Sequence, residues 1–223
     1  MNQTKVPNPV AAWEEAYLRF ETPEEEVQKF QKRYREIGAE AWGRESEIVE
    51  IFCGRGGGLI ALERMGFTRI EGVDLSQPLL DQYSGPAKTL RADCRQLPFA
   101  DASKDIVVVQ GGLHHLDRIP DDLVQVLAEV ERVLRPAGRF VCVEPWLTPF
   151  LRIVHWVARR RLARRLSSKI DALQTMIVHE QRTYDQWLGQ GPAILTALDR
   201  FFQSEKRSMA WGKLIYVGRR KRR

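Results

Sequence analysis

"VEIFCGRGGG", from Val49 to Gly58, is the stretch that decides the fold. An apolar strand-forming run leads into a glycine-rich turn, and a helix-forming sequence follows it. Gly54 and Gly56 allow a tight turn and a close approach of the backbone to a ligand, because neither carries a Cβ atom. Such a turn between a strand and a helix is typical of nucleotide-binding proteins.

Strand and helix patterns alternate from Glu45 to Trp146. Apolar runs such as "EIVEIFC", "RIEGVDLS", "DIVVVQGG" and "RFVCVEPW" predict strands, and amphipathic segments such as "DDLVQVLAEVERVL" predict helices between them. This alternation indicates parallel βαβ units, and nearly continuous apolar strands indicate a sheet covered on both faces. We therefore expect an α/β fold with a mostly parallel sheet.

The flanking segments are predicted to be mainly helical. Residues 8–38 have helical periodicity and stop at Gly38, while two closing strands are expected to pair around Gly212. The predicted organisation has four parts: N-terminal helices (1–44), a ligand-binding core (45–147), a helical insertion after the fifth strand (148–190), and a last helix and closing strands with a basic tail (191–223).

The composition argues against several classes of protein. A chain of 223 residues, 43% of them hydrophobic, suffices for one domain with a full core, and it has no apolar run of about 18 residues to span a membrane. The N-terminus lacks an apolar signal segment. Cys53, Cys94 and Cys142 lack the spacing of a zinc site or of a disulfide framework. We therefore expect a cytoplasmic protein without a metal site.

Three kinds of ligand compete for the glycine turn. A dinucleotide loop needs G-x-G-x-x-G/A, but the sixth position counted from Gly54 is Leu59, and no GK[S/T] triplet of a phosphate-binding loop follows. A nucleoside without phosphates remains, and S-adenosylmethionine (SAM) is such a ligand. Asp74, at the end of the second strand, can accept both ribose hydroxyl hydrogens, and Asp93, after the third strand, can accept from an adenine amino group.

Taken together, these pieces resemble class I SAM-dependent methyltransferases, of the broad group that includes ubiquinone/menaquinone-biosynthesis methyltransferases. The resemblance covers about Glu45 to Trp146 and rests on "VEIFCGRGGG", "EGVDLS", "ADCRQLPF", "DIVVVQGGLHHL", "EVERVLRPAGRF" and "VEPW". It implies a Rossmann-like, doubly wound sheet of about seven strands with an antiparallel last strand. It also implies the following residues around the cofactor: Glu50, Phe52, Gly54, Gly56, Asp74, Leu75, Asp93, Cys94, Gln110 and Gly111.

The resemblance assigns Glu50 and the two glycines to the methionine end of SAM, Asp74 to the ribose and Asp93 to the adenine. Phe52 departs from the family pattern, which usually reads acid-x-Gly-x-Gly-x-Gly and has a glycine at this position. On strand alternation Glu50 and Phe52 point to the same side. The ring is therefore expected beside the cofactor or against the neighbouring helix.

Methyl transfer from a sulfonium depends mainly on positioning, but a hydroxyl nucleophile benefits from a base. His115, after the fourth strand, and Glu144, ending the fifth, are the candidate bases, and one of the adjacent His114 and His115 is expected to be structural. O-methylation is favoured, since no Asn-Pro-Pro-Tyr amine-binding motif follows the fourth strand. Three residues of the insertion are expected to shape the acceptor site: His179, Glu180 and Tyr184.

The net charge of +6 comes from two local clusters. Leu151 to Leu166 holds six arginines and no acidic residue, and the tail beginning at Arg219 is entirely basic, which leaves the rest of the chain mildly acidic. This distribution argues against a broad nucleic-acid surface. Three interpretations of the arginine-rich segment, residues 152–165, stay open: a solvated helix face, a lid that attracts an anionic acceptor, and a membrane-surface contact.

The leading hypothesis is a methyltransferase that uses SAM, yields S-adenosylhomocysteine (SAH) and acts on a small-molecule or lipid-linked acceptor. Its expected location is cytoplasmic or membrane-peripheral. Two alternatives stay open: a non-catalytic SAM- or nucleoside-binding partner protein, and an RNA methyltransferase, against which the absence of an appended RNA-binding segment counts.

Overall fold

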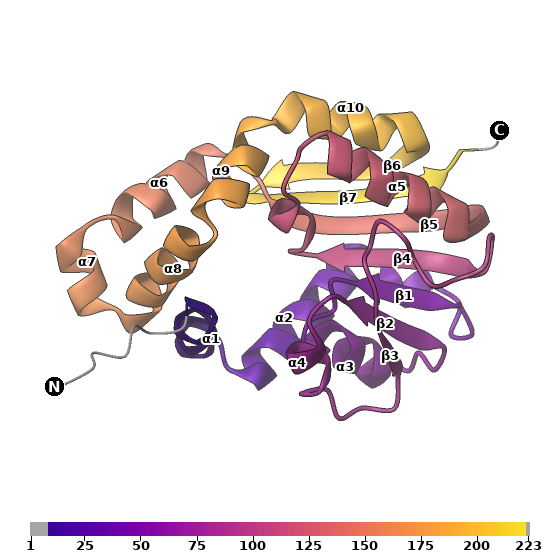
Figure 1. Cartoon of the computed structure of the whole chain (residues 1–223), viewed down its shortest axis with the longest axis horizontal. Coiled ribbons are helices and arrows are strands. Elements are labelled where there is room, and N and C mark those ends of the chain that lie inside the picture. The colour runs from indigo at the N-terminus through magenta and orange to yellow at the C-terminus, as the bar shows by residue number, and fades with distance from the viewer. Residues whose placement is uncertain (1–8, 222–223) are drawn as a thin grey trace, which may run out of the picture.

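The alternating strand and helix patterns form one central sheet in the computed structural model, which describes residues 9–221 (Figure 1). Residues 1–8 of the predicted N-terminal helices and residues 222–223 of the basic tail lie outside the described range. The strands are β1 (Ile48–Ile51), β2 (Ile70–Asp74), β3 (Lys88–Arg91), β4 (Lys104–Gln110), β5 (Leu134–Pro145), β6 (Phe202–Ala210) and β7 (Lys213–Arg220).

Helices cover the sheet and extend beyond one end of it. They are α1 (Pro9–Phe20), α2 (Pro23–Glu36), α3 (Gly57–Arg64), α4 (Gln77–Leu80), α5 (Asp121–Val133), α6 (Pro149–Ala158), α7 (Arg161–Leu166), α8 (Ser168–His179), α9 (Gln181–Gly189) and α10 (Gly191–Phe201). Two short 3-10 turns, η1 (Ala39–Ala41) and η2 (Leu113–His115), complete the elements of the described residues.

The strand order is β3-β2-β1-β4-β5-β7-β6 within the described chain. The first five strands pair in parallel, and β7 pairs antiparallel with both β5 and β6. The chain reverses between β1 and β4, which makes the carboxyl ends of these two strands the expected ligand position in an open α/β sheet. The predicted Rossmann-like sheet with N-terminal helices, a helical insertion after the fifth strand and an antiparallel last strand is confirmed.

The segment Pro136–Gly138 lies in a bulge of β5 and does not end α5. Leu134 pairs with Lys104 and Arg139 pairs with Ile106, so the intervening residues leave the ladder. The helix already ends at Val133, and the ladder is interrupted because Pro136 has no N–H to donate and Ala137 adopts a positive φ of 67°. The sheet therefore continues through this stretch with a local irregularity in its ladder.

Two apolar clusters, one on each face of the sheet, make the fold doubly wound. On one face α5 and α10 pack against side chains such as Val107 and Phe140, and on the other α2 and α3 pack against Ile106 and Val141. Alternate residues of one strand thus belong to different clusters, as strand geometry requires. None of the described helices is long and apolar enough to cross a membrane.

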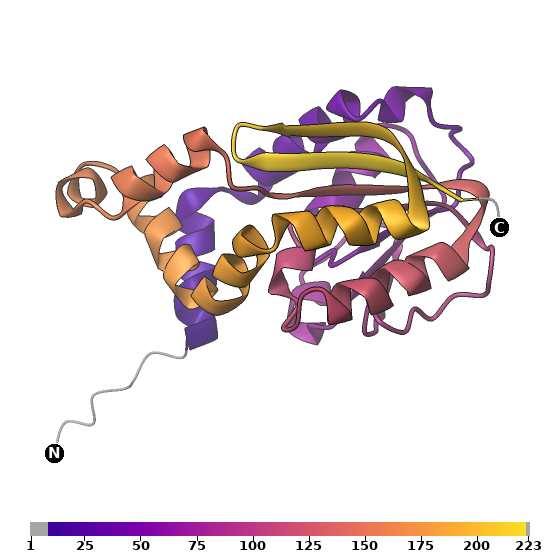
Figure 2. The ribbon, with the colours of Figure 1, turned by 90° about the horizontal axis from the view of Figure 1, so that it is seen from above.

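The insertion extends from the carboxyl end of β5 and meets the N-terminal helix. Ala16 of α1 packs with Ala172 and Met176 of α8, although these residues are far apart in the sequence. Both figures of the ribbon show α1, α8 and α9 grouped beyond the same end of the sheet (Figures 1 and 2). The segments on either side of the core therefore come together over the end where a ligand is expected.

Candidate functional site

A pocket of about 670 Å³ lies at the carboxyl ends of the parallel strands. Glu50 of β1, Asp74 of β2 and Gln110 of β4 form its floor. Tyr17 of α1 and Met176 of α8 contribute to its outer wall. The site is therefore built from the core, the N-terminal helices and the insertion together.

Glu50 is almost fully buried at 2% exposure and lies at the centre of this floor. Its Oε1 atom accepts hydrogen bonds of 3.4 Å from the Tyr34 hydroxyl and from Nε2 of Gln110, whereas Oε2 has no hydrogen-bond partner in the described chain. Burial raises the pKa of Glu50 to about 8. A buried carboxyl with an unpartnered oxygen is costly without a ligand, and a cationic donor would satisfy it.

The glycine turn leaves room for Glu50 and places Asp74. A Cβ on Gly58 would lie 2.2 Å from the Glu50 carboxylate oxygens, so only glycine fits the first turn of α3 here. The two oxygens of Asp74 accept from the backbone N–H groups of Gly54 and Ser76, at 2.8 Å each. These bonds fix the carboxylate at the pocket floor, and its remaining lone pairs can accept ribose hydroxyls.

Leu59 does not hold α3 away from the sheet. It is fully buried, and a Cβ on Gly72 of β2 would lie only 2.7 Å from its side chain. The glycine on the strand thus makes the space that a dinucleotide loop makes with a glycine on the helix. The helix and the strand therefore pack closely here too, but the glycine, Gly72, lies on the strand and the large side chain, Leu59, lies on the helix.

Phe52 lines the pocket and has a φ of 58°, the left-handed conformation that glycine adopts without strain. This backbone requirement explains why the resembling family has a glycine there. The ring lies against Gly112, where a Cβ would be 2.3 Å from the Phe52 Cγ atom. Phe52 is therefore accommodated by the absence of a side chain at the end of β4.

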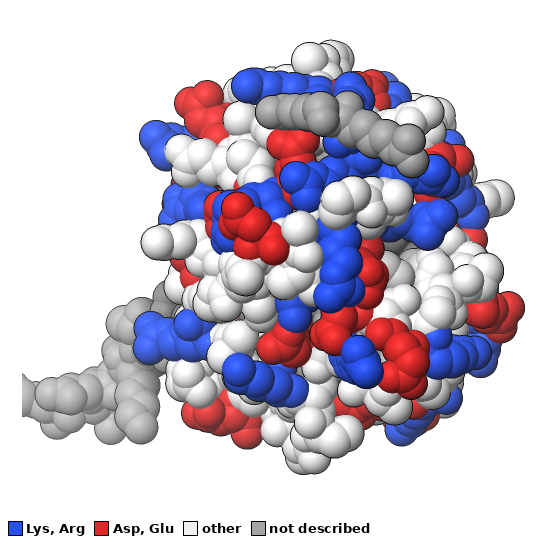
Figure 3. All heavy atoms as spheres, turned by 90° about the vertical axis from the view of Figure 1, so that its right-hand side faces the viewer, with Lys and Arg blue, Asp and Glu red and all other residues white. Residues whose placement is uncertain are grey.

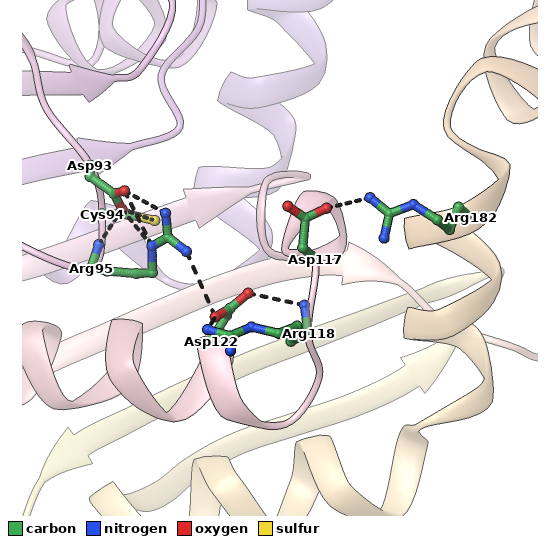
Figure 4. A network of polar contacts seen from close by, with 7 residues as sticks. All are labelled: Asp93, Cys94, Arg95, Asp117, Arg118, Asp122 and Arg182. Atoms are coloured by element: carbon green, nitrogen blue, oxygen red, sulfur yellow. Dashed lines mark hydrogen bonds and ion pairs between the residues drawn. The ribbon is translucent and has the colours of Figure 1, made fainter.

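Asp93 and Cys94 lie at the edge of the pocket in a network of charges (Figure 4). Arg95 donates to both oxygens of Asp93 and approaches Asp122 at 3.7 Å. The hydrogen bonds from Arg95 hold the pKa of Asp93 below its usual range. The contact of Asp93 with an adenine stays a prediction, and its carboxylate already accepts hydrogen bonds from Arg95.

The N-terminal helices contribute cations that the sequence motifs do not reveal. Arg33 and Lys29 of α2 and Arg55 of the glycine turn line the pocket. Nε of Arg33 and Nη2 of Arg55 are buried without hydrogen-bond partners in the described residues. Arg33 favours the charged form of Glu50, but burial outweighs this effect and the pKa of Glu50 stays raised. The amphipathic pattern of α2 predicts a buried face but does not tell which basic side chain reaches a ligand.

The histidine pair has two different environments. Nδ1 of His114 is 2.8 Å from Oε2 of Glu144, and its Nε2 is 3.6 Å from Glu180. Burial opposes charge on His114, but the hydrogen bonds to Glu144 and Glu180 outweigh it and raise its pKa to about 9. Desolvation inside the pocket and the neighbouring charge of His114 lower the pKa of His115 to about 4.

Glu144 of β5 binds His114 and fixes its orientation. Its Oε1 atom accepts from the backbone N–H groups of Gly112 and Leu113 at 2.9 Å, and its side chain is fully buried outside the pocket lining. Nδ1 of His114 is thereby directed at Glu144. Both histidines line the pocket, and His115 is the exposed one of the two. That Glu144 acts as a catalytic base stays a prediction. Its hydrogen bonds are those of a residue that orients His114.

The other predicted residues divide into those that line the pocket and those that do not. Glu180 and Tyr184 of the insertion line it, as do all the predicted cofactor residues except Gly56. Gly56 instead begins α3 with a φ of 81° and lies against the Tyr83 ring. His179 is exposed at the end of α8.

His114, His115 and Glu180 also form a group that has the side-chain types of a metal site. Their candidate ligand atoms lie within 4.8 Å of one another in the described chain. The expectation of a protein without a metal stays a prediction. Without a metal, the same atoms form the ion pair of His114 with Glu180.

The strand order, the glycine turn at the end of β1 and the acid at the end of β2 are those that the resemblance to class I SAM-dependent methyltransferases implies. Residues 49–142 match the family described as "Methyltransferase domain". This match confirms the resemblance seen in the sequence, over the core and not over the flanking helices.

The curated relatives cover the same region. The chain is 37% identical over 108 residues to the demethylmenaquinone methyltransferase of Staphylococcus aureus strain MRSA252, and 36% identical over 109 residues to that of strain JH9. These alignments cover 44% of this chain and 42% or 43% of the relatives. The chain therefore matches less than half the length of either relative.

Solved structures share the fold over most of the chain. A protein from Pyrococcus horikoshii OT3 superposes with a TM-score of 0.66 at 19% identity, covering 93% of this chain and 97% of the other. The geranyl diphosphate C-methyltransferase of Streptomyces coelicolor A3(2) gives 0.58 at 15% identity, with 89% and 81% covered. At these identities the likeness shows the fold alone.

The raised pKa of Glu50 predicts a dependence of stability on pH. Because the folded pKa of about 8 exceeds the ordinary value of 4.5, the folded protein holds an extra proton between these values and loses stability as the pH rises. Glu50→Gln removes this effect. We expect the variant without ligand to be more stable than the wild type at pH 9, by at most about 5 kcal/mol, with little difference at pH 4.

Urea unfolding from pH 4 to pH 9 measures this difference. Glu40→Gln, at an exposed position, is the matched control and is expected to show a pH-independent change within about 0.5 kcal/mol. A constant offset between Glu50→Gln and the wild type across the range would contradict the burial of a titrating carboxyl.

The contact of Phe52 with Gly112 predicts a strong coupling between these positions. Gly112→Ala alone is expected to cost about 2 kcal/mol of unfolding free energy, because its Cβ meets the ring. In a Phe52→Gly background the same change has room and is expected to cost less than about 0.5 kcal/mol. Gly189→Ala, where a Cβ meets nothing within 4 Å, is the control. Additive costs in a double-mutant cycle would disprove the contact.

Proposed function

We propose that this chain transfers a methyl group from SAM to a small-molecule or lipid-like acceptor. The observation that carries the proposal is the presence of an acidic and a basic side chain in the pocket, Glu50 and Arg33, each with a buried atom that lacks a hydrogen-bond partner in the described chain. The amino-acid end of SAM carries an ammonium and a carboxylate. Glu50 is suited to the ammonium and Arg33 to the carboxylate.

The remaining parts of SAM have matching positions along the same pocket. Asp74 is held for the ribose hydroxyls, and Asp93 with Cys94 lies farther along for the adenine. In this arrangement the ligand has no pyrophosphate, so no basic side chain of the pocket has to bind one. The order of these groups supports a phosphate-free nucleoside with an amino-acid tail.

The histidine pair favours an acceptor with an acidic hydroxyl. His115 is neutral at pH 7 and can take a proton, but its low pKa makes it a weak base. A phenol-like hydroxyl, with a pKa of about 10, loses its proton far more readily than an aliphatic alcohol. The charged His114, with its ring centroid 4.1 Å from that of His115, would stabilise the resulting oxyanion. We infer O-methylation of a phenol-like or enol-like acceptor.

The names of the relatives allow a second chemistry at the same site. The Staphylococcus aureus relatives are demethylmenaquinone methyltransferases, and one structural neighbour is a C-methyltransferase acting on geranyl diphosphate. An acceptor deprotonated at oxygen can also react at an adjoining ring carbon. The acceptor class is thus the same for both outcomes, and product analysis distinguishes them.

Calorimetric titration tests cofactor binding. We expect SAM and SAH to bind and NAD not to bind, because Glu50 is matched to the ammonium of an amino-acid tail, a group that NAD lacks. Asp74→Ala should weaken SAH binding about tenfold to a hundredfold through loss of the ribose contacts. Asp81→Ala, at the exposed C-cap of the neighbouring helix α4, is the control and should bind like the wild type. Binding of NAD without binding of SAH would overturn the proposal.

Product formation tests the acceptor class. With SAM as donor we expect methylation of naphthalene-1,4-diol and none of 1-naphthylmethanol, which has the same rings and an aliphatic hydroxyl. His115→Gln should lower kcat about a hundredfold or more and leave the dissociation constant of SAH unchanged. Equal turnover of both compounds, or an unaffected kcat in the variant, would remove His115 as the base. Binding of SAH without turnover of any acceptor would favour the non-catalytic alternative.

A further inference from the structure

Apolar and basic side chains share one exposed surface formed by α6, α7 and the turn between β6 and β7. We call it the arginine–tryptophan surface. Its members are Phe150, Arg152, Ile153, Trp156, Arg159, Arg160, Arg161, Leu162, Arg164, Arg165, Leu166 and Trp211. In the ribbon seen from above, α6 starts beside the turn of the β6–β7 hairpin, and α7 lies at the far end of the molecule (Figure 2).

The apolar members are unusually exposed for their size. Trp156 is 59% exposed, Leu162 69% and Trp211 74%, and Leu166 reaches 79%. Exposed Leu or Trp residues are ordinary when single, but a contiguous group on one surface marks a contact site. The surface is therefore suited to a partner that covers apolar side chains.

The surface is held in place by specific contacts. The Thr148 hydroxyl accepts from the backbone N–H groups of Leu151, in the first turn of α6, and of Gly212, in the hairpin turn. The rings of Phe150 and Trp211 meet edge to face at a centroid distance of 5.4 Å. The two segments thus form one preformed surface and not two independent loops.

Most of the basic members have no acidic partner in the described chain. Of the six arginines, Arg164 pairs with Asp171 and Arg160 lies 4.3 Å over the Trp156 ring. The other four, Arg152, Arg159, Arg161 and Arg165, have no ion-pair partner within residues 9–221. On the opposite end of the molecule, Lys and Arg lie beside Asp and Glu over most of the visible face (Figure 3).

We propose that the arginine–tryptophan surface docks on an anionic membrane surface. Arginines next to Trp, Leu and Ile side chains match the boundary between lipid headgroups and acyl chains, where Trp is enriched and anionic lipids attract basic residues. A second copy of the chain is a poorer occupant, because a self-complementary contact would bring two sets of arginines together. RNA would use the arginines but leave the exposed aliphatic side chains uncovered.

Docking would also place the pocket close to the bilayer. Helix α8 packs against α6 and α7, and its residues Leu173, Met176 and Ile177 line the pocket. Leu18 of α1, also a lining residue, is half exposed at the same end. An apolar acceptor leaving the membrane would therefore meet the apolar wall of the pocket first.

Co-sedimentation of the full chain with vesicles tests the proposal. We expect pelleting with phosphatidylcholine vesicles that contain about one quarter phosphatidylglycerol, and much less with phosphatidylcholine alone or at high salt. Arg159→Gln/Arg160→Gln/Arg161→Gln should lower the partition coefficient at least tenfold. Lys32→Gln/Lys88→Gln/Arg200→Gln removes the same charge at exposed positions elsewhere and is expected to lower it by less than about threefold.

Tryptophan quenching tests the depth of the contact. Brominated phosphatidylcholine in the same anionic vesicles should quench the fluorescence of the wild type, and Trp156→Ser/Trp211→Ser should lose most of that quenching. Three results would each overturn the proposal. They are equal partition of the two triple variants, a concentration-dependent dimer without lipid that Trp156→Ser/Trp211→Ser abolishes, and binding to polyuridine at least as tight as to the anionic vesicles.

Discussion

The buried carboxyl of Glu50 is the constraint on which the rest of the site depends. Its volume requires glycine at position 58, so the helix after β1 must begin with residues that lack a side chain. Its polarity requires donors, and Tyr34 from α2 and Gln110 from β4 supply them to one oxygen only. The other oxygen is left for a ligand. A variant without the Glu50 carboxyl would be more stable at alkaline pH, but it would lack the group best suited to bind a cation in the pocket.

The core of the site could be predicted because its signals are local. A strand, a glycine turn and an acid at the next strand end follow one another in the sequence, and parallel strands bring their carboxyl ends together. Positions such as Glu50, Asp74 and Asp93 therefore line the pocket as expected. The doubly wound order of the sheet followed from the same alternation and from the resemblance.

The outer half of the site could not be predicted, because tertiary packing alone creates it. Arg33 precedes the glycine turn on a separate helix, and nothing in its periodicity shows that its guanidinium reaches a ligand. Leu59 stands where a dinucleotide loop needs glycine or alanine, but Gly72 on the neighbouring strand provides the space for its side chain. Glu144 binds His114 from a different strand, and this contact, which no motif shows, gives the two adjacent pocket histidines different environments. The contact between α1 and α8, which closes the pocket, joins two segments that no motif relates.

The titration of Glu50 with and without cofactor tests the central claim most directly. The account assigns the free carboxyl oxygen to the ammonium of the cofactor. Selective carbon-13 labelling of glutamate lets nuclear magnetic resonance follow the Glu50 carboxyl, with Glu50→Gln assigning the signal. We predict a pKa of about 8 in the free protein, and a pKa lowered by at least about two units with saturating SAH, because the ammonium stabilises the charged form. An ordinary pKa in the free protein, or the same raised pKa after SAH has bound, would contradict the account.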